Sequence, residues 1–230
     1  MRRLKRLHCA DQMRCIALSD THNSAEGVAI PDGDVLLHAG DLTMKGTAPE
    51  LERAVRWLAS LRGRFRAIVA IPGNHDFGIE DYPDGARTLF ADHGVTLLID
   101  EPFALGGVTF YGSPWQPWFF DWAYNFPRDD RGAIAKRTWA KIPAGTDIVI
   151  THGPPHGVLD RTERGDHAGC PHLLRELRGR VRPKVHLFGH IHEGYGEHRE
   201  DETLYLNAST CDFHYAATQP PIAFDVGCAE

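Results

Sequence analysis

The sequence predicts an α/β fold, with a mixed sheet or two packed sheets and helices on the outside. Short apolar runs rich in β-branched residues recur along the chain, and each ends in a polar cluster, which is typical of buried strands. Helical patterns separate several early runs, whereas the later runs follow one another closely. At 230 residues, 42% of them hydrophobic and 24% charged, the chain can bury a sizeable core.

Nine strands are expected where apolar residues occur in short runs, and four helices are expected between them. The strands cover residues 15–18, 35–37, 67–71, 95–99, 108–111, 148–150, 185–188, 203–206 and 222–224. The first helix opens at Pro49 and has one apolar face, made of Leu51, Val55, Leu58 and Leu61. The other helices cover residues 87–92, 130–139 and 172–178, with Gly179 closing the last.

Residues 113–126 differ from the rest because they are rich in Pro, Trp and Phe and show no clean periodicity. They are expected to form an ordered loop that packs by its own aromatic side chains. The alternative is a wall of a substrate pocket, in which one ring, such as Trp115, stacks on a nucleobase.

No linker rich in Ser and Gly divides the chain, which predicts one domain over residues 13–230. Residues 1–12 contain four Lys and Arg side chains and are expected to be a disordered basic extension. Two alternatives are a functional basic arm and a true start at Met13. The odd number of five cysteines, without a C-x-x-C pair, favours a reducing cytoplasm.

The net charge of −6 argues against a protein that binds duplex nucleic acid, which would need a basic face. It leaves open a small phosphate ligand, because bound metal ions can reverse the local field. No apolar run approaches the roughly 18 residues of a membrane span, so no membrane partner is expected. The sequence does not specify an oligomeric state.

Five of the expected strands end in clusters of Asp, Asn and His, and the chain has 14 histidines in all. In open α/β sheets, ligands bind outside the carboxyl ends of the strands, so these clusters are expected to converge. Two pairs are spaced i, i+2, which in extended backbone places both side chains on one side. These pairs are Asp20 with His22 and His190 with His192.

The donors at these strand ends are two Asp, one Asn and four or five His. They are too many for one tetrahedral ion and enough for two ions that share a bridging carboxylate. A mixture of imidazole, carboxylate and amide donors favours Mn, Fe, Zn or Co over Ca or Mg.

Five blocks now identify a family. The polar blocks resemble, in order and over about residues 14–226, those of the calcineurin-like metallophosphoesterase superfamily. They are D-x-H at 20–22, G-D at 40–41, G-N-H-D at 73–76, T-H-G at 151–153 and G-H-x-H at 189–192. The runs H-A-G-D-L-T, Y-G-S-P-W-Q-P-W-F, T-H-G-P-P and N-A-S-T-C are similar to its small metallophosphoesterase-domain-containing subfamily. The resemblance implies an α/β/β/α sandwich of two packed mixed sheets flanked by helices.

The resemblance also implies two divalent transition metal ions (Mn, Fe, Zn or Co, with Mn favoured in vitro). The ligands of the first ion would be Asp20, His22 and His192. Asp41 would bridge to the second ion, whose other ligands would be Asn74, His152 and His190. Some relatives carry Gly at the position of His190 and are poor catalysts, so His190 implies a complete second site.

In the implied mechanism, a metal-bridging hydroxide attacks phosphorus and His75 protonates the leaving alkoxide. Asp76 would orient the His75 imidazole. Two alternatives for His75 are a further metal ligand and a structural hydrogen bond. Asn74 and His75 would contact the substrate, and His156 and Trp115 are further candidates for substrate binding.

The expected substrates are small phosphodiesters, chiefly 2′,3′- or 3′,5′-cyclic nucleotides. The alternatives are a phosphomonoesterase or protein phosphatase, a nuclease, and a nucleotide-binding protein with little turnover. Outside the blocks, His38 is either a support for a ligand or a packed residue, and His186 is expected in the core. Surface positions or local hydrogen bonds are expected for the other histidines, which are His8, His93, His167, His172, His198 and His214.

Overall fold

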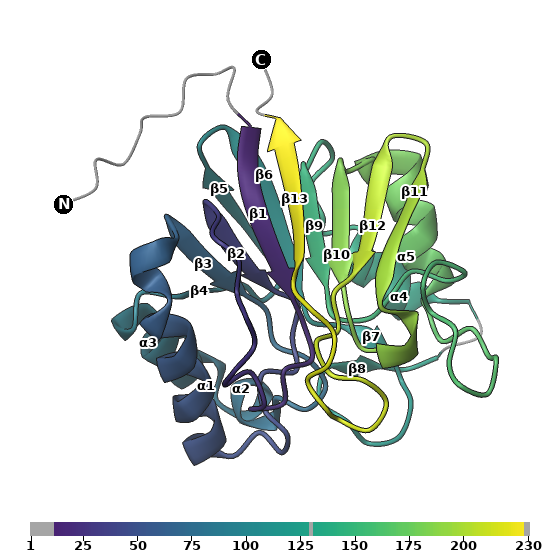
Figure 1. Cartoon of the computed structure of the whole chain (residues 1–230). Coiled ribbons are helices and arrows are strands. Elements are labelled where there is room, and N and C mark those ends of the chain that lie inside the picture. Colours follow the sequence, from purple (N-terminus) through teal and green to yellow (C-terminus); the bar gives the residue numbers. More distant parts are fainter. Residues whose placement is uncertain (1–11, 129–130, 228–230) are drawn as a thin grey trace.

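The computed structural model describes residues 12–128 and 131–227. Two β-sheets face each other in the middle (Figure 1). Helices α1 (Ala48–Ser60) and α3 (Pro83–Asp92) lie outside one sheet, and α4 (Ala133–Trp139) and α5 (Pro171–Glu176) lie outside the other. The expected α/β/β/α sandwich is therefore confirmed. Gln12 is the first residue of strand β1, and the rest of the expected basic extension, with His8, lies outside the described residues.

The first sheet contains five strands in the order β13-β1-β2-β3-β4. Strands β1 to β4 are parallel, and β13 pairs antiparallel with β1. The carboxyl ends of β1 to β4 therefore lie at one edge of this sheet. The bounds are Ile222–Gly227 for β13, Gln12–Leu18 for β1, Val35–His38 for β2, Ala67–Ala70 for β3 and Thr96–Leu97 for β4.

The second sheet contains six strands in the order β11-β12-β10-β9-β6-β5. The four inner strands are parallel, whereas β5 and β11 are antiparallel edge strands. The bounds are Gly196–Glu200 for β11, Thr203–Asn207 for β12, Val185–Phe188 for β10, Ile148–Thr151 for β9, Val108–Ser113 for β6 and Glu101–Leu105 for β5.

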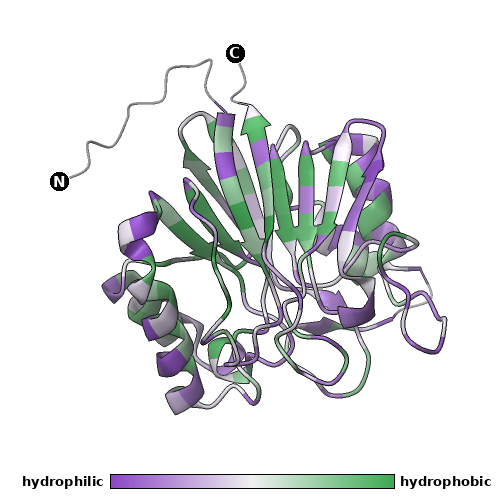
Figure 2. Cartoon of the chain, viewed as in Figure 1, coloured by the Kyte–Doolittle hydropathy of each residue, from purple (hydrophilic) through white to green (hydrophobic). Residues whose placement is uncertain are grey.

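The alternation of side chains along the strands builds a core on each face of each sheet. In β1, Cys15 and Ala17 belong to the core between the two sheets. Ile16 and Leu18 face the other way and pack with residues of α1 and α3. A third core lies between the second sheet and the helices α4 and α5, around the fully buried Trp139. The inner strands are accordingly mostly apolar, and polar residues gather on the outer helix faces (Figure 2).

The helices begin close to where the sequence places them. Helix α1 (Ala48–Ser60) opens with a capping box between Thr47 and Glu50. Helix α3 (Pro83–Asp92) begins one turn earlier than expected, and α4 (Ala133–Trp139) begins later. Helix α5 (Pro171–Glu176) continues into a π-helical turn (Leu177–Val181), so Gly179 does not end it.

Four strands and one short helix were not predicted from the sequence. β5 and β11 are edge strands whose residues are mostly exposed or half-buried, so they lack an apolar run. β7 (Gln116–Pro117) and β8 (Asn125–Phe126) pair within the segment expected to be a loop. Helix α2 (Phe77–Asp81) is too short to show a periodicity. The expected strand over residues 95–99 is reduced to β4.

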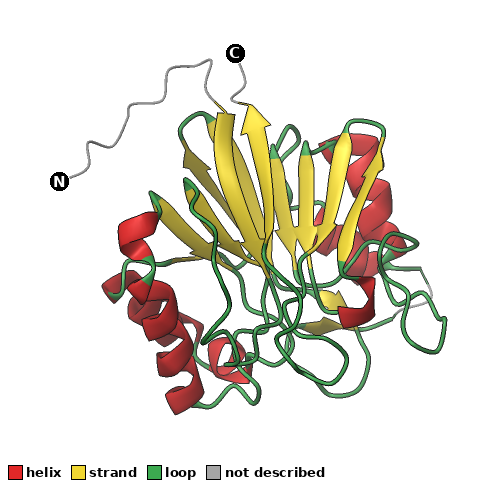
Figure 3. Cartoon of the chain, in the orientation of Figure 1, coloured by secondary structure: helices red, strands yellow, loops and turns green. Residues whose placement is uncertain are grey.

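Long loops leave the carboxyl ends of the parallel strands and gather below the sheets in the view of Figure 3. Strand β1 begins and strand β13 ends at the opposite edge (Figure 1). The loop-bearing edge is where an open α/β sheet binds its ligands. Among the described residues, no helix is long and apolar enough to cross a membrane.

Candidate metal centre

The polar blocks that follow β1, β2, β3, β9 and β10 meet at this edge and form one buried cluster. Three groups of side chains within it each place one donor atom per residue within 4.8 Å of the others. The groups share members and so form a continuous set. They are Asp20 with His22 and His192, His22 with Asp41 and His75, and Asp20 with Asp41 and His152.

Asp20, His22 and His192 lie together as the sequence predicts. His192 Nε2 lies 3.3 Å from Asp20 Oδ1 and 3.5 Å from His22 Nε2. The other ring nitrogen of each histidine is held by a main-chain carbonyl: His22 Nδ1 donates to Thr43 at 3.1 Å and His192 Nδ1 to Asp212 at 2.9 Å. These hydrogen bonds orient both rings so that each Nε2 faces the cluster, where it can bind a metal ion once deprotonated.

Asp41 stands between the histidines of the cluster. Its Oδ1 lies 3.4 Å from His152 Nε2, and its Oδ2 lies 3.7 Å from His22 Nε2. Asn74 Oδ1 lies 2.8 Å from His152 Nε2, and His152 Nδ1 donates to the Ala39 carbonyl at 2.9 Å. A carboxylate with one oxygen toward each set of donors has the geometry required for a bridging ligand.

His190 joins the cluster through its ring and its main chain. Its ring centroid lies 5.0 Å from that of His152. Its main-chain N–H donates to both carboxylate oxygens of Asp20, at 3.1 and 2.9 Å, and so holds Asp20 in place. Burial lowers the pKa of His190 to about 3, so its imidazole is neutral and able to bind a metal.

The backbone of these residues is not extended, which corrects one part of the sequence reasoning. Asp20, His22, Asp41 and His190 all have positive φ, at 52°, 44°, 55° and 70°. Non-glycine residues rarely adopt this left-handed region, and strained backbone of this kind clusters at functional sites. The side chains of Asp20 and His22 therefore converge through a left-handed turn rather than through strand alternation.

His75 lies beside the cluster with its Nε2 directed at it. Its Nδ1 donates to the Met44 carbonyl at 2.7 Å, and its Nε2 lies 3.9 Å from Asp41 Oδ2. Its main-chain N–H donates to Asp41 Oδ1 at 2.8 Å. The imidazole packs on Trp122, with ring centroids 4.2 Å apart.

The expectation that Asp76 orients the imidazole of His75 is wrong. The Asp76 carboxylate accepts hydrogen bonds from the main-chain N–H groups of Leu42, Thr43 and Gly73 and from the Thr43 hydroxyl, at 2.7 to 3.2 Å. It therefore ties together the two loops that carry Asp41 and Asn74. Burial raises the pKa of Asp76 to about 6. The Met44 carbonyl, rather than a carboxylate, holds the His75 ring.

The carboxylates and imidazoles of the cluster shift one another's pKa values. Burial alone would raise the pKa of Asp20, but its hydrogen bond and charge interaction with His192 lower it well below the usual value. Burial would lower the pKa of His152 and His192, but Asp41 and Asp20, respectively, raise each to about 9. The two carboxylates thus create a local field that favours bound positive charge.

The donor set fits divalent metal ions. The Nε2 atoms of His22 and His192 lie 3.5 Å apart beside two carboxylates, an arrangement that suits a cation held between them. Imidazole nitrogens, carboxylates and an amide oxygen are the donors that borderline divalent metals take. The site is buried, and its histidines are oriented by main-chain carbonyls, as metal-binding histidines commonly are.

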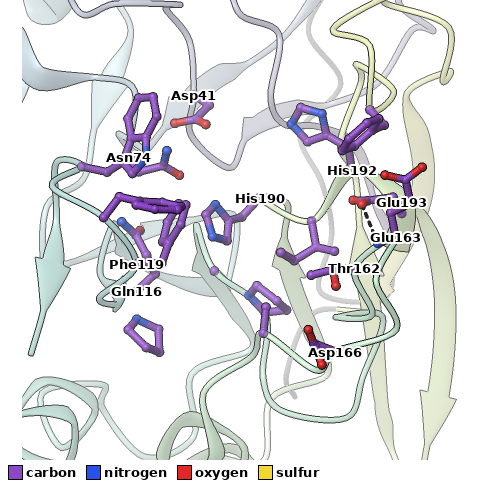
Figure 4. A pocket seen from close by; sticks show the side chains of 18 of the residues that line it. Asp41, Asn74, Gln116, Phe119, Thr162, Glu163, Asp166, His190, His192 and Glu193 are labelled. Atoms are coloured by element: carbon purple, nitrogen blue, oxygen red, sulfur yellow. Dashed lines mark hydrogen bonds between the residues drawn. The ribbon is translucent and has the colours of Figure 1, made fainter. Parts of the chain in front are cut away.

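A cavity of about 590 Å³ opens from the cluster to the surface (Figure 4). Asp41, Asn74, His75, His190 and His192 form its inner end. Its other walls combine aromatic and charged side chains. The aromatic set is Phe119, Phe120, Trp122, Phe213 and Tyr215, and the charged set is Arg128, Glu163, Arg164, Asp166 and Glu193.

Two residues predicted to bind substrate lie elsewhere. Trp115 is not among the residues that line this cavity; its Nε1 donates to Asp100 Oδ2 at 3.1 Å, and its ring packs on Tyr124. His156 also lies outside the cavity lining, about half exposed and 3.9 Å from Asp160 Oδ2. The aromatic segment is therefore both a packed loop and a cavity wall, but with different rings in each role.

Two further histidines have internal roles. His38 is buried, accepts the Gly40 N–H on Nδ1 and lies 3.0 Å from the Thr21 hydroxyl through Nε2. It connects the first block, through Thr21, with the second, through Gly40. His186 is in the core, as predicted, 2.9 Å from the Thr151 hydroxyl.

Sequence reasoning missed residues that support or cover the cluster. The Ser209 hydroxyl donates to Asp20 Oδ2 at 2.9 Å, and its only sequence signal is its place in the run N-A-S-T-C. Tyr215 has a positive φ of 61°, and its ring packs on His22 and His192, with centroids 4.9 and 5.4 Å away. Tyr215 has no motif of its own and comes near the cluster only through the fold.

Residues 7–194 match the model of the calcineurin-like phosphoesterase family, in agreement with the geometry of the cluster. The chain belongs to this family. Members of this fold use divalent metal ions, and the Asp and His cluster is the candidate site for them.

Similar proteins match almost the whole chain. The human metallophosphoesterase domain-containing protein 1 is 37% identical over 235 residues, which are 93% of this chain and 71% of that protein. A UPF0046 protein of Caenorhabditis elegans is 33% identical over 94% of this chain and 82% of its own. The crystal structure of TT1561 of Thermus thermophilus shares the fold, with a TM-score of 0.60 at 14% identity, over 95% of this chain and all of that one.

Proposed function

We propose that this metallophosphoesterase is a phosphodiesterase dependent on two divalent metal ions, and that it hydrolyses small phosphodiesters of the cyclic nucleotide type. One observation carries the proposal: a cluster of metal-type donors forms the inner end of a cavity whose outer walls are aromatic. The volume of about 590 Å³ is in the range of small-molecule sites. It suits a nucleotide better than a folded protein.

The residues of the cluster divide into two sets around Asp41. Asp20, His22 and His192 would hold one ion, and Asn74, His152 and His190 the other, with Asp41 shared. Two bound divalent ions would polarise the phosphoryl oxygens and lower the pKa of the attacking water. Mn²⁺, Fe²⁺, Zn²⁺ and Co²⁺ all suit these donors, and Mn²⁺ is the first ion to test.

His75 is placed to handle the proton of the leaving group. Its Nδ1–H is committed to the Met44 carbonyl, so only Nε2 is free to act on the substrate. Nε2 lies at the inner end of the cavity, 3.9 Å from Asp41 Oδ2. When protonated, it would give its proton to the departing alkoxide oxygen as the ester bond breaks.

Charge distribution favours a diester over the alternative substrates. Among the described cavity-lining residues, Lys and Arg contribute only Arg128 and Arg164, whereas Glu163, Asp166 and Glu193 are acidic. A monoester dianion or a nucleic-acid strand would meet more repulsion here than a diester monoanion does. The net charge of −6 acts in the same direction.

A buried, unpaired set of described cysteines, Cys15, Cys170 and Cys211, fits our proposal of a cytoplasmic location.

The test is a substrate screen with chelator-treated protein reconstituted with Mn²⁺. Turnover of 2′,3′- and 3′,5′-cyclic nucleotides would be compared with turnover of the matching nucleoside monophosphates, with the position of the product phosphate read by NMR. The proposal expects faster diester cleavage that disappears when the chelator is added back. Faster monoester release would favour a phosphatase, and nucleotide binding without hydrolysis would favour a binding protein.

A further inference from the structure

Large aromatic side chains remain exposed at the mouth of the cavity. Phe120 is 73% exposed, Phe213 52% and Tyr215 42%, and all three line the cavity. Exposing apolar rings to water is unfavourable, and contiguous exposed apolar surface beside a cleft is typical of a binding site. These rings therefore have a reason to be covered by a ligand.

The rings come from two loops that reach different histidines of the metal cluster. In the first loop, Phe119 packs edge-on to His190 with centroids 4.9 Å apart, and Trp122 packs on His75. In the second loop, Tyr215 packs on His22 and His192. A phosphate bound at the cluster would thus have an aromatic wall at each of two sides, close enough for the rest of the molecule to contact both.

The cavity also holds a fixed and unused hydrogen-bond acceptor. The amide nitrogen of Gln116 donates to the Ala123 carbonyl at 2.8 Å and to Asn125 Oδ1 at 3.1 Å, which determines the orientation of the amide. Gln116 Oε1 is buried and has no hydrogen-bond partner in the described part of the chain. Gln116 lines the cavity with Phe119, as Figure 4 shows.

A buried carbonyl oxygen without a partner is costly and rare in folded proteins. Its partner must be a donor, since a carbonyl oxygen only accepts. The Thr162 hydroxyl, also in the cavity wall, is likewise buried without a partner among the described residues. The cavity is therefore apolar on its ring-bearing walls and has unsatisfied polar groups at fixed positions, as sites for nucleobases do.

We infer that the outer part of this cavity is a subsite for a nucleobase that carries an amino or ring N–H group. The base would stack against the rings of the two loops, and its N–H would donate to Gln116 Oε1. The inference rests on the proposed function for its phosphate end, but it adds the residues that select the substrate. It names Gln116, Phe119 and Phe213 as specificity-determining residues.

The first experiment measures binding rather than turnover. Calorimetry of the Mn²⁺-loaded protein would compare AMP with ribose 5-phosphate, which has the phosphate and sugar but no base. The subsite predicts that AMP binds at least about 5-fold more tightly, and that Phe119→Ala and Phe213→Ala each weaken AMP binding by about 5- to 150-fold. Binding of ribose 5-phosphate should change less than about 2-fold in these variants.

Trp118 provides the matched control, because it belongs to the same aromatic segment but is not among the residues that line the cavity. It is 48% exposed, so Trp118→Ala removes a comparable exposed ring. This variant should bind AMP as the wild type does. Equal affinity of the wild type for AMP and ribose 5-phosphate, or equal losses in Trp118→Ala and Phe119→Ala, would overturn the inference.

The second experiment tests the acceptor. Purine riboside 5′-monophosphate lacks the amino group of AMP, so the wild type should prefer AMP over it by about 5-fold or more. Gln116→Met, which removes the acceptor but keeps the chain length, should abolish this preference. If Gln116→Met fails to fold, the wild-type comparison alone still tests the acceptor, because equal affinities for the two nucleotides would exclude it. A preference that survives in Gln116→Met would exclude the role of Gln116.

Hydrolysis of methyl p-nitrophenyl phosphate separates this inference from the proposed function. If that diester is cleaved but the protein shows no preference for a base, the subsite is wrong and the phosphodiesterase stands. If AMP binds with the predicted preference but no diester is cleaved, the phosphodiesterase is wrong and the subsite stands.

Discussion

Replacing His75 separates its proposed acid role from the alternative role as a metal ligand. His75→Ala removes the imidazole but keeps the main-chain N–H that donates to Asp41 Oδ1 at 2.8 Å. Because Asp41 therefore stays in place and no proposed metal ligand is lost, the variant should still bind two ions per chain. His75→Gln, which fills more of the space beside Trp122, provides a second variant if His75→Ala is unstable.

The size of the effect follows from the position of Nε2. It is the free nitrogen of a ring fixed by the Met44 carbonyl, so its loss removes the proton donor without removing the donors of the cluster. General acid catalysis contributes about 100- to 10,000-fold, or ~3–5.5 kcal/mol of transition-state stabilisation. The full loss is expected with an alkoxide leaving group. With p-nitrophenolate, which leaves without a proton, the loss should be less than about 10-fold.

The assay compares kcat/KM for a cyclic nucleotide and for methyl p-nitrophenyl phosphate, with metal content measured on the same samples. His198→Ala is the control, since His198 is an exposed residue of the edge strand β11. It should resemble the wild type with both substrates. Loss of a metal ion in His75→Ala, or an equal loss of rate with both substrates, would refute the acid role and favour His75 as a ligand.

Two further predictions concern the scaffold. A Cβ on Gly73 would overlap Asp41 Oδ1, so Gly73→Ala should lower the Mn²⁺ affinity, measured by calorimetry, at least about 10-fold. Gly63→Ala is the control and should leave the affinity unchanged, because the space beside Gly63 is open. Equal Mn²⁺ affinities of the two variants would contradict the close packing of Gly73 on Asp41. Burial would raise the pKa of Asp147, but hydrogen bonds, first from Thr109, lower it below its usual value. The ionised carboxylate therefore stabilises the folded state above pH ~4, and this contribution to the free energy of unfolding is lost as the pH falls through the pKa of the folded state. Asp147→Asn should cost about 1.5–3 kcal/mol in urea at pH 7 and flatten the acid loss of stability, and an unchanged pH profile would rule this out.

Much of the fold could be predicted because its inner strands are buried on both faces and read as apolar runs. Strands β5 and β11 were not predicted, because one side of an edge strand is exposed and their composition therefore resembles that of a loop. The segment that holds β7 and β8 lacks periodicity because its rings pack in two directions. Some belong to the cores, and others line the cavity.

The metal-type donors could be predicted because each lies next to the end of a strand, and strand ends converge in this class of fold. Their supports could not be predicted. Met44 lies 31 residues before His75 and Ser209 lies 189 residues after Asp20, so only the folded loops bring them together. Sequence adjacency was also misleading for Asp76, whose carboxylate turns away to hold Thr43 and Gly73.

The binuclear centre is the central claim, and the metal content of variants tests it most directly. Chelator-treated protein would be reconstituted with Mn²⁺, passed through a desalting column and analysed by inductively coupled plasma mass spectrometry. The wild type should retain two ions per chain, and Asp41→Asn, which replaces the shared carboxylate with a neutral amide, should retain at most one. His38→Gln should still retain two, because His38 contacts Thr21 and Gly40 rather than the cluster. One ion or none in the wild type, or equal metal content in Asp41→Asn and His38→Gln, would contradict the account.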